Sequence, residues 1–189
     1  MTVESPTREI LSVGLKYGLV GSIIAIGLFF AMKGLGENPL IWTVPKLVVY
    51  SIVFVLFPLL ALAEFRRYHW DGSKWKFWYG LVLGIMVYGT ICLGTFLTTY
   101  VAMLADSSLV ASYQESSLQS LESRHDEFLK QFGEEQYAQT REAIITITTG
   151  EIALDDLLKK LLLGFFFTAT LALAVNIISS LRSRTISNS

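Results

Sequence analysis

Charged residues are scarce in this sequence. Asp, Glu, Lys and Arg make up only 16% of the 189 residues, whereas 52% are hydrophobic, and the formal net charge is −1. This composition is typical of an integral membrane protein, whose main partner is the lipid bilayer, and we expect no nucleic-acid partner. The length suits a single domain, residues 1–189. The single cysteine, Cys92, excludes an intrachain disulfide.

Signatures of catalysis and metal binding are also missing. The sequence has no H-E-x-x-H, G-x-S-x-G or P-loop motif. Glu122 and His125 form one E-x-x-H, but a di-iron site needs a second copy and two further glutamates, and the chain has no second copy. No carboxylate lies in the middle of an apolar run, where a proton or ion pathway usually has one. We therefore expect no enzyme, no cofactor and no metal.

Four long apolar runs dominate the sequence instead. They cover about residues 15–34, 44–64, 77–104 and 161–181. A helix needs about twenty residues to cross a bilayer core of about 30 Å, and the runs are continuous rather than alternating, unlike barrel strands. The expected fold is an all-α integral membrane protein with four transmembrane helices. The first run lacks an A-x-A pattern at its end, so we expect it to be retained rather than cleaved.

Lys and Arg are unevenly distributed among the connecting segments. Arg8 and Lys16 stand at the N-terminal side, four basic residues lie within residues 66–76, and Arg182 and Arg184 follow the last run. With four crossings, these three segments lie on the same side. The positive-inside rule then places both termini in the cytoplasm.

The third and fourth runs are separated by a polar stretch, residues 106–160. It holds eleven acidic residues against five basic ones, a net charge of −6. We expect an extracytoplasmic helical insertion here, with a helix end at Gly133 and a restart after Gly150 that leads into the fourth crossing. The restarted helix has two acid-before-base pairs four residues apart, Asp155–Lys159 and Asp156–Lys160.

The insertion carries an apolar stripe at helical spacing, which must pack against something. The packing partner of the stripe is either a second helix of the insertion, the third crossing or another protein. The stripe is our candidate interaction surface and consists of Leu118, Leu121, Phe128, Leu129 and Phe132.

Small residues mark candidate helix contacts. We expect the first and third crossings to pack along Gly18 and Gly21 on one side and Gly80 and Gly84 on the other, since glycines let membrane helices approach closely. The alternative is a homodimer through one of these faces. Pro58 and Asn176 interrupt the apolar runs and have either a structural role or a place along a solute path.

The order of these segments resembles a known family. The first crossing opens with LKYGLVGSII, a basic link follows the second, a long Glu/Gln-rich insertion follows the third, and the last crossing ends in NIISSLRSR. This layout is similar to the family catalogued as domain of unknown function 4199, small four-helix inner-membrane proteins of Bacteroidota. The proline that usually precedes the last crossing is replaced by LDDLLKK. The resemblance implies no activity, cofactor or catalytic residue, and it suggests a membrane glycosyltransferase as a neighbouring partner.

Two functional hypotheses follow. The leading one is a non-enzymatic accessory or scaffold subunit in envelope processes, with the insertion as its contact surface. The alternative is a small oligomeric transporter or channel, with Pro58 and Asn176 along the path. The lack of buried charge in the apolar runs favours the first hypothesis.

Overall fold

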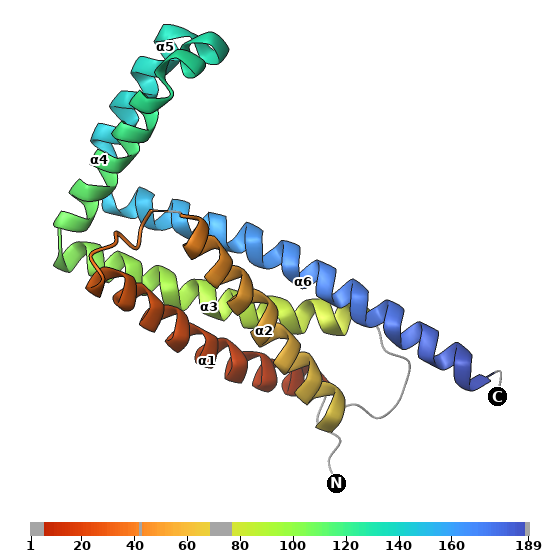
Figure 1. Ribbon diagram of the computed structural model, residues 1–189. Helices are drawn as coiled ribbons and strands as arrows, with labels where there is room; N and C mark the ends of the chain where they lie inside the picture. Colours follow the sequence, from red (N-terminus) through yellow and green to blue (C-terminus); the bar gives the residue numbers. More distant parts are fainter. Residues whose placement is uncertain (1–5, 42, 69–76, 188–189) are drawn as a thin grey trace.

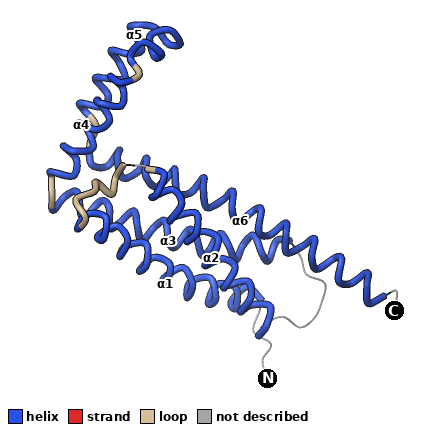
Figure 2. Tube along the Cα trace, viewed as in Figure 1, coloured by secondary structure: helices blue, strands red, loops and turns tan. Residues whose placement is uncertain are grey.

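The chain folds into helices. The computed structural model describes residues 6–41, 43–68 and 77–187, and these contain six helices and no strand (Figure 2). Lys74 and Lys76 of the basic link, like His69, lie outside the described residues. The helices are α1 (Pro6–Gly34), α2 (Val44–Tyr68), α3 (Phe77–Ala105), α4 (Ser108–Ser123), α5 (His125–Thr146) and α6 (Thr149–Ser187).

Four of these helices are long and apolar enough to cross a membrane. Their candidate spans are Arg8–Gly34, Val44–Arg67, Phe77–Ala105 and Thr149–Ile177. The predictions of an all-helical fold and of four long apolar helices are therefore confirmed. The fourth span differs from the prediction, since it begins twelve residues before residue 161 and so includes charged side chains.

The four long helices form a bundle with α3 between α1 and α6, and α2 packs across all three (Figure 1). The first described residues and the end of α6 lie at one end of the bundle, and α4 and α5 lie at the other. Large apolar side chains also cover the outside of the bundle. Ile23, Leu93 and Leu162, for example, are 70%, 58% and 72% exposed. Exposed apolar surface on this scale is what lipid would cover.

The helices start and stop at recognisable signals. The end of α1 has both hydrogen bonds of a Schellman motif: Glu37 N donates to Met32 O (3.0 Å) and Gly36 N to Lys33 O (3.1 Å). Gly36 has φ +83°, which favours glycine. At the start of α6, Thr148 and Glu151 form a capping box, with Thr148 N donating to Glu151 Oε2 over 2.7 Å. This cap starts α6 before Gly150, not after it as predicted.

Glycines lie at the contacts between the long helices, although not in the predicted pairs. Gly18 and Gly21 of α1 do face α3, where Cβ atoms would lie 2.5 Å and 2.6 Å from Thr90 and Ile91. Gly80 and Gly84 of α3, in contrast, face α6, where they pack against Ala172 and Thr168. The predicted pairing of Gly18 and Gly21 with Gly80 and Gly84 is therefore wrong, because α3 turns this face towards a different helix.

We call residues 108–146, which form α4 and α5, the arm. The arm projects away from the bundle (Figure 1). Gly133 has φ +82° and ψ 171° and interrupts the helical conformation within α5, so the predicted helix end at this glycine is confirmed. Two short non-helical joints connect the arm to the bundle, residues 106–107 and residues 147–148. Residues 149–160, which the sequence assigned to the insertion, belong to α6.

Candidate functional site

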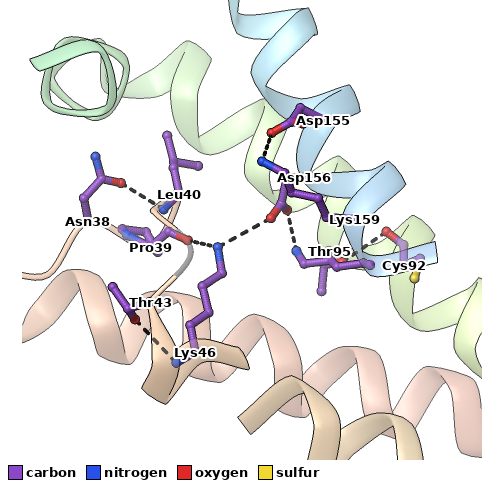
Figure 3. A network of polar contacts seen from close by, with 11 residues as sticks. Asn38, Pro39, Leu40, Thr43, Lys46, Cys92, Thr95, Asp155, Asp156 and Lys159 are labelled. Carbon is purple, nitrogen blue, oxygen red and sulfur yellow. Dashed lines mark hydrogen bonds and ion pairs between the residues drawn. The ribbon is translucent and has the colours of Figure 1, made fainter. Parts of the chain in front are cut away.

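Three charged side chains meet inside the bundle, where the start of α2 packs against α6. Asp156 Oδ2 accepts from Lys160 Nζ at 2.5 Å. Asp156 Oδ1 lies 3.4 Å from Lys46 Nζ, a contact that Figure 3 shows. Lys46, Asp156 and Lys160 expose only 3%, 4% and 1% of their surface. We call these three residues the buried cluster.

Tyr50 and the backbone of Pro39 complete the surroundings of the cluster. Lys46 Nζ donates to Pro39 O at 2.5 Å (Figure 3). The Tyr50 ring centroid lies 4.7 Å from Lys160 Nζ and 6.0 Å from Lys46 Nζ, distances at which an ammonium group is attracted to an aromatic ring. The contacts of the two ammonium groups thus include a carboxylate, a carbonyl oxygen and an aromatic ring.

Local structure brings Lys46 to this position. Gly36 ends α1, and Asn38 then fixes the loop: its Oδ1 accepts from Leu40 N (2.9 Å) and its Nδ2 donates to Leu109 O of α4 (3.1 Å). This loop presents Pro39 O to Lys46. Thr43 lies directly before α2, in the position of a cap, and its Oγ1 is 3.5 Å from Lys46 N. Lys46 therefore lies in the first turn of α2.

The position of Lys46 is electrostatically unfavourable in two ways. Burial removes the ammonium group from water, which costs several kcal/mol unless the charge is paired. The N-terminal end of a helix also carries a partial positive charge, which repels a cation in the first turn. Asp156 offsets both effects, but it does so for Lys46 and Lys160 together. The formal charge of the three side chains is +1.

The sequence predicts part of this cluster but not its burial. The Asp156–Lys160 pair was predicted from its spacing, and the structure confirms the contact. We predicted no buried charge within the apolar runs, but Lys46 lies in the second run and is buried. The fourth span also begins before residue 161 and so includes the buried Asp156 and Lys160. The spacing along α6 does indicate this burial. Every fourth residue lies on the buried face of the helix, namely Ile152, Asp156, Lys160 and Gly164.

The candidate interaction surface lies on the arm. Leu121 is buried, and Phe128 packs against Phe132 and Tyr137 with ring centroids 4.9 Å and 6.0 Å apart. Leu118 and Leu129 are half-buried. Phe132 is 59% exposed. Much of the predicted stripe thus packs within the arm, and Phe132 remains accessible near the Gly133 reversal.

The lone E-x-x-H also lies on the arm. The His125 ring packs edge-on against Tyr137 with centroids 4.7 Å apart, and His125 Nδ1 is 3.2 Å from the Asp126 carboxylate. Within the part of the chain that the structure describes, no group of three His, Cys, Asp or Glu side chains could hold a metal ion.

A further ion pair lies where the arm joins the bundle. Lys33 Nζ at the end of α1 is 2.8 Å from Asp106 Oδ2 directly after α3, and Asp106 Oδ1 also accepts from Ser108 N at 3.1 Å. These interactions hold the pKa of Asp106 at about 2, below its usual value of 3.8, and the Lys33 contact is the largest cause. The pair connects two parallel helices to the first joint of the arm.

These features define the class of the protein. It is an all-helical bundle with four helices long and apolar enough to cross a membrane, a buried ionic cluster near one end and a projecting helical arm. The chain belongs to the family described as Protein of unknown function (DUF4199), which matches residues 14–176, from α1 through the arm into α6. The family resemblance is thus confirmed. Comparisons with curated proteins and with solved structures gave no match.

Proposed function

We propose that this protein is a non-enzymatic accessory or scaffold subunit of a bacterial inner membrane, in an organism of the Bacteroidota. The arm lies outside the membrane on the extracytoplasmic side, both termini are cytoplasmic, and the arm binds a protein partner. The basic residues near both termini and in the link 66–76 support this orientation. The family match covers residues 14–176 and so includes the arm.

One observation carries the proposal: Phe132 is 59% exposed near the reversal of an arm that projects from the bundle. A large aromatic side chain held on a structured element can bury much area in a partner at low entropic cost. The partner class we favour is another membrane protein, such as a glycosyltransferase of envelope assembly. A second copy of this chain is the other candidate.

Site-specific photocrosslinking in native membranes tests this function. A photoreactive amino acid at Phe132 is expected to give one discrete protein adduct, identified by mass spectrometry. The same probe at Gln119, exposed on α4, serves as the control. An adduct of twice the 21.1 kDa chain identifies self-association. Equal, diffuse crosslinking at both positions would count against a partner surface at Phe132.

Two substitutions separate binding from folding of the arm. Phe132→Ser removes an exposed ring and should leave the helix content of the arm unchanged while abolishing the interaction. Phe128→Asp places a charge between Phe132 and Tyr137 and should unfold the arm, whereas His125→Gln should be tolerated. Hydrogen exchange of the arm amides measures folding. If Phe132→Ser retained the partner, the contact surface would have to lie elsewhere.

The buried cluster favours transport as the second candidate function. Ionisable groups inside a membrane bundle usually mark a path for ions or solutes. Pro58, fully buried in α2, lies twelve residues from Lys46, about 18 Å along the helix, so it belongs to a different level of the bundle. Proteoliposomes with a pH-sensitive dye test this role. Transport through the cluster predicts a proton leak in the wild type and in Asp155→Asn that Asp156→Asn abolishes. A leak equal to that of protein-free liposomes would exclude proton transport.

A further inference from the structure

A pocket of about 490 Å³ lies between the end of α1 and the start of α2. Its volume falls within the range of about 300–1,000 Å³ that small-molecule sites occupy. The walls are mostly apolar and come from both helices and from the loop between them. The main apolar side chains of the wall are Leu28, Phe29, Met32, Leu35, Pro45 and Val49.

The pocket adjoins the buried cluster. Lys46, Pro39 and Tyr50 line the pocket and also form part of the cluster's surroundings. Figure 3 shows the Lys46 side chain between Pro39 and Asp156. A molecule in the pocket therefore lies beside Lys46, Pro39 and Tyr50 and within a largely apolar wall.

Charge decides which kind of molecule fits. Two ammonium groups and one carboxylate leave a formal charge of +1 in a buried site, and the N-terminal end of α2 adds a partial positive charge. An anion in the pocket would offset both the formal charge of the cluster and the partial charge of the helix end. Glu37 is the acidic residue among those that line the pocket, and it is exposed, where water and salt weaken its repulsion.

We propose that this pocket binds one anionic phospholipid, with an acyl chain along the apolar wall and the phosphate group near the Lys46 end. The pocket lies where α1 ends and α2 begins, which is the level of the headgroups if the helices span a bilayer. Basic side chains near the membrane surface attract anionic headgroups. A small water-soluble anion would leave the apolar wall uncovered. The site is separate from the arm, so it goes beyond the proposed function.

Native mass spectrometry of the full-length protein, released from nanodiscs of equal parts phosphatidylglycerol and phosphatidylcholine, tests the proposal. One basic side chain near an anionic headgroup contributes about 1 kcal/mol, so phosphatidylglycerol should be retained about fivefold over phosphatidylcholine. Lys46→Met should abolish this preference, and Lys46→Arg should keep it. A separate titration with inorganic phosphate tests the headgroup chemistry alone and should show no binding.

Because Lys46→Met also disturbs the buried cluster, a second pair of variants leaves the cluster intact. Val49→Trp fills the pocket and should remove the bound lipid, whereas Val48→Trp, at the neighbouring position on the outer face of α2, should keep it. The proposal is overturned if wild-type protein shows no preference for phosphatidylglycerol. It is also overturned if Val49→Trp retains the lipid as Val48→Trp does, or if inorganic phosphate binds without lipid.

Discussion

Asp155 and Asp156 are consecutive residues that each pair with a lysine four positions later, yet their surroundings differ. The Asp155–Lys159 pair exposes 44% and 47% of its side chains, whereas the Asp156–Lys160 pair exposes 5% and 1%. Exposed ion pairs generally contribute little to stability. A buried pair that loses one partner leaves an uncompensated charge behind. The same sequence motif therefore has different energetic weight at adjacent positions.

This contrast gives the first prediction. Asp156→Asn should lower the free energy of unfolding by about 3–5 kcal/mol, because it removes the carboxylate that contacts both buried ammonium groups. Asp155→Asn should cost about 0.3–0.5 kcal/mol. Unfolding of both variants in mild detergent, followed by circular dichroism, measures the difference. Similar losses in the two variants would mean that the cluster is hydrated rather than buried.

The second prediction at this scale concerns Asp106, which lies outside the candidate spans. Its carboxyl should titrate with a pKa of about 2, and Lys33→Met should move the pKa back towards 3.8. Since the folded-state pKa is lowered, the stabilisation from this pair is complete above the ordinary value of 3.8 and is lost as the pH falls towards 2. NMR titration of the Asp106 carboxyl carbon provides the measurement. A midpoint that Lys33→Met does not change would rule out the ion pair as its main cause.

At the scale of helices, α3 is the element on which the bundle depends. It packs against α1, α2 and α6, and its small residues set the distance to two of them. A Cβ at Gly84 would collide with the Thr168 side chain of α6, whereas Gly89 has nothing within 4 Å of such an atom. The two glycines are five residues apart on the same helix, so their intrinsic helix propensities are matched.

The third prediction uses this pair. Gly84→Leu should destabilise the protein by about 1–3 kcal/mol or more, since a large side chain must push α3 and α6 apart. Gly89→Leu should be neutral or slightly stabilising, because leucine favours a helix more than glycine does. Thermal stability and folded yield in detergent give the comparison. Equal behaviour of the two variants would contradict the α3–α6 contact.

The contrast between predicted and observed features has a physical reason. Apolar length alone located the four long helices, and the Gly133 reversal and the Asp156–Lys160 contact followed from local rules. The contact of Gly84 with α6 could not be predicted from the sequence, because α3 is apolar on all sides and its rotation depends on packing against neighbours. The burial of Lys46 could not be predicted either, since Lys46 pairs with Asp156, which lies 110 positions away in the sequence.

For the molecule as a whole, the fourth prediction is that the basic link faces the cytoplasm and the arm faces the extracytoplasmic side. Single cysteines replace Ser73, in the basic link, and Gln119, on the arm, in a background with Cys92→Ala. An impermeant maleimide added to intact spheroplasts should label the cysteine at 119 and not the one at 73, because the basic segments favour the cytoplasm. Detergent-treated cells serve as the control for reactivity at both positions. Labelling of the cysteine at 73 alone would show that the protein has the opposite orientation.

The two joints of the arm have a consequence for how such proteins diversify. Both lie at the same end of the bundle, one before α4 and one after α5, and hydrogen bonds of Asp106 and Thr148 hold them. The bundle contacts the arm at these joints and at the first residues of α4, where Asn38 donates to Leu109 O and Leu109 packs in one apolar cluster with Phe29. Arms of different length or sequence can therefore be connected to the same helical bundle without changing its packing.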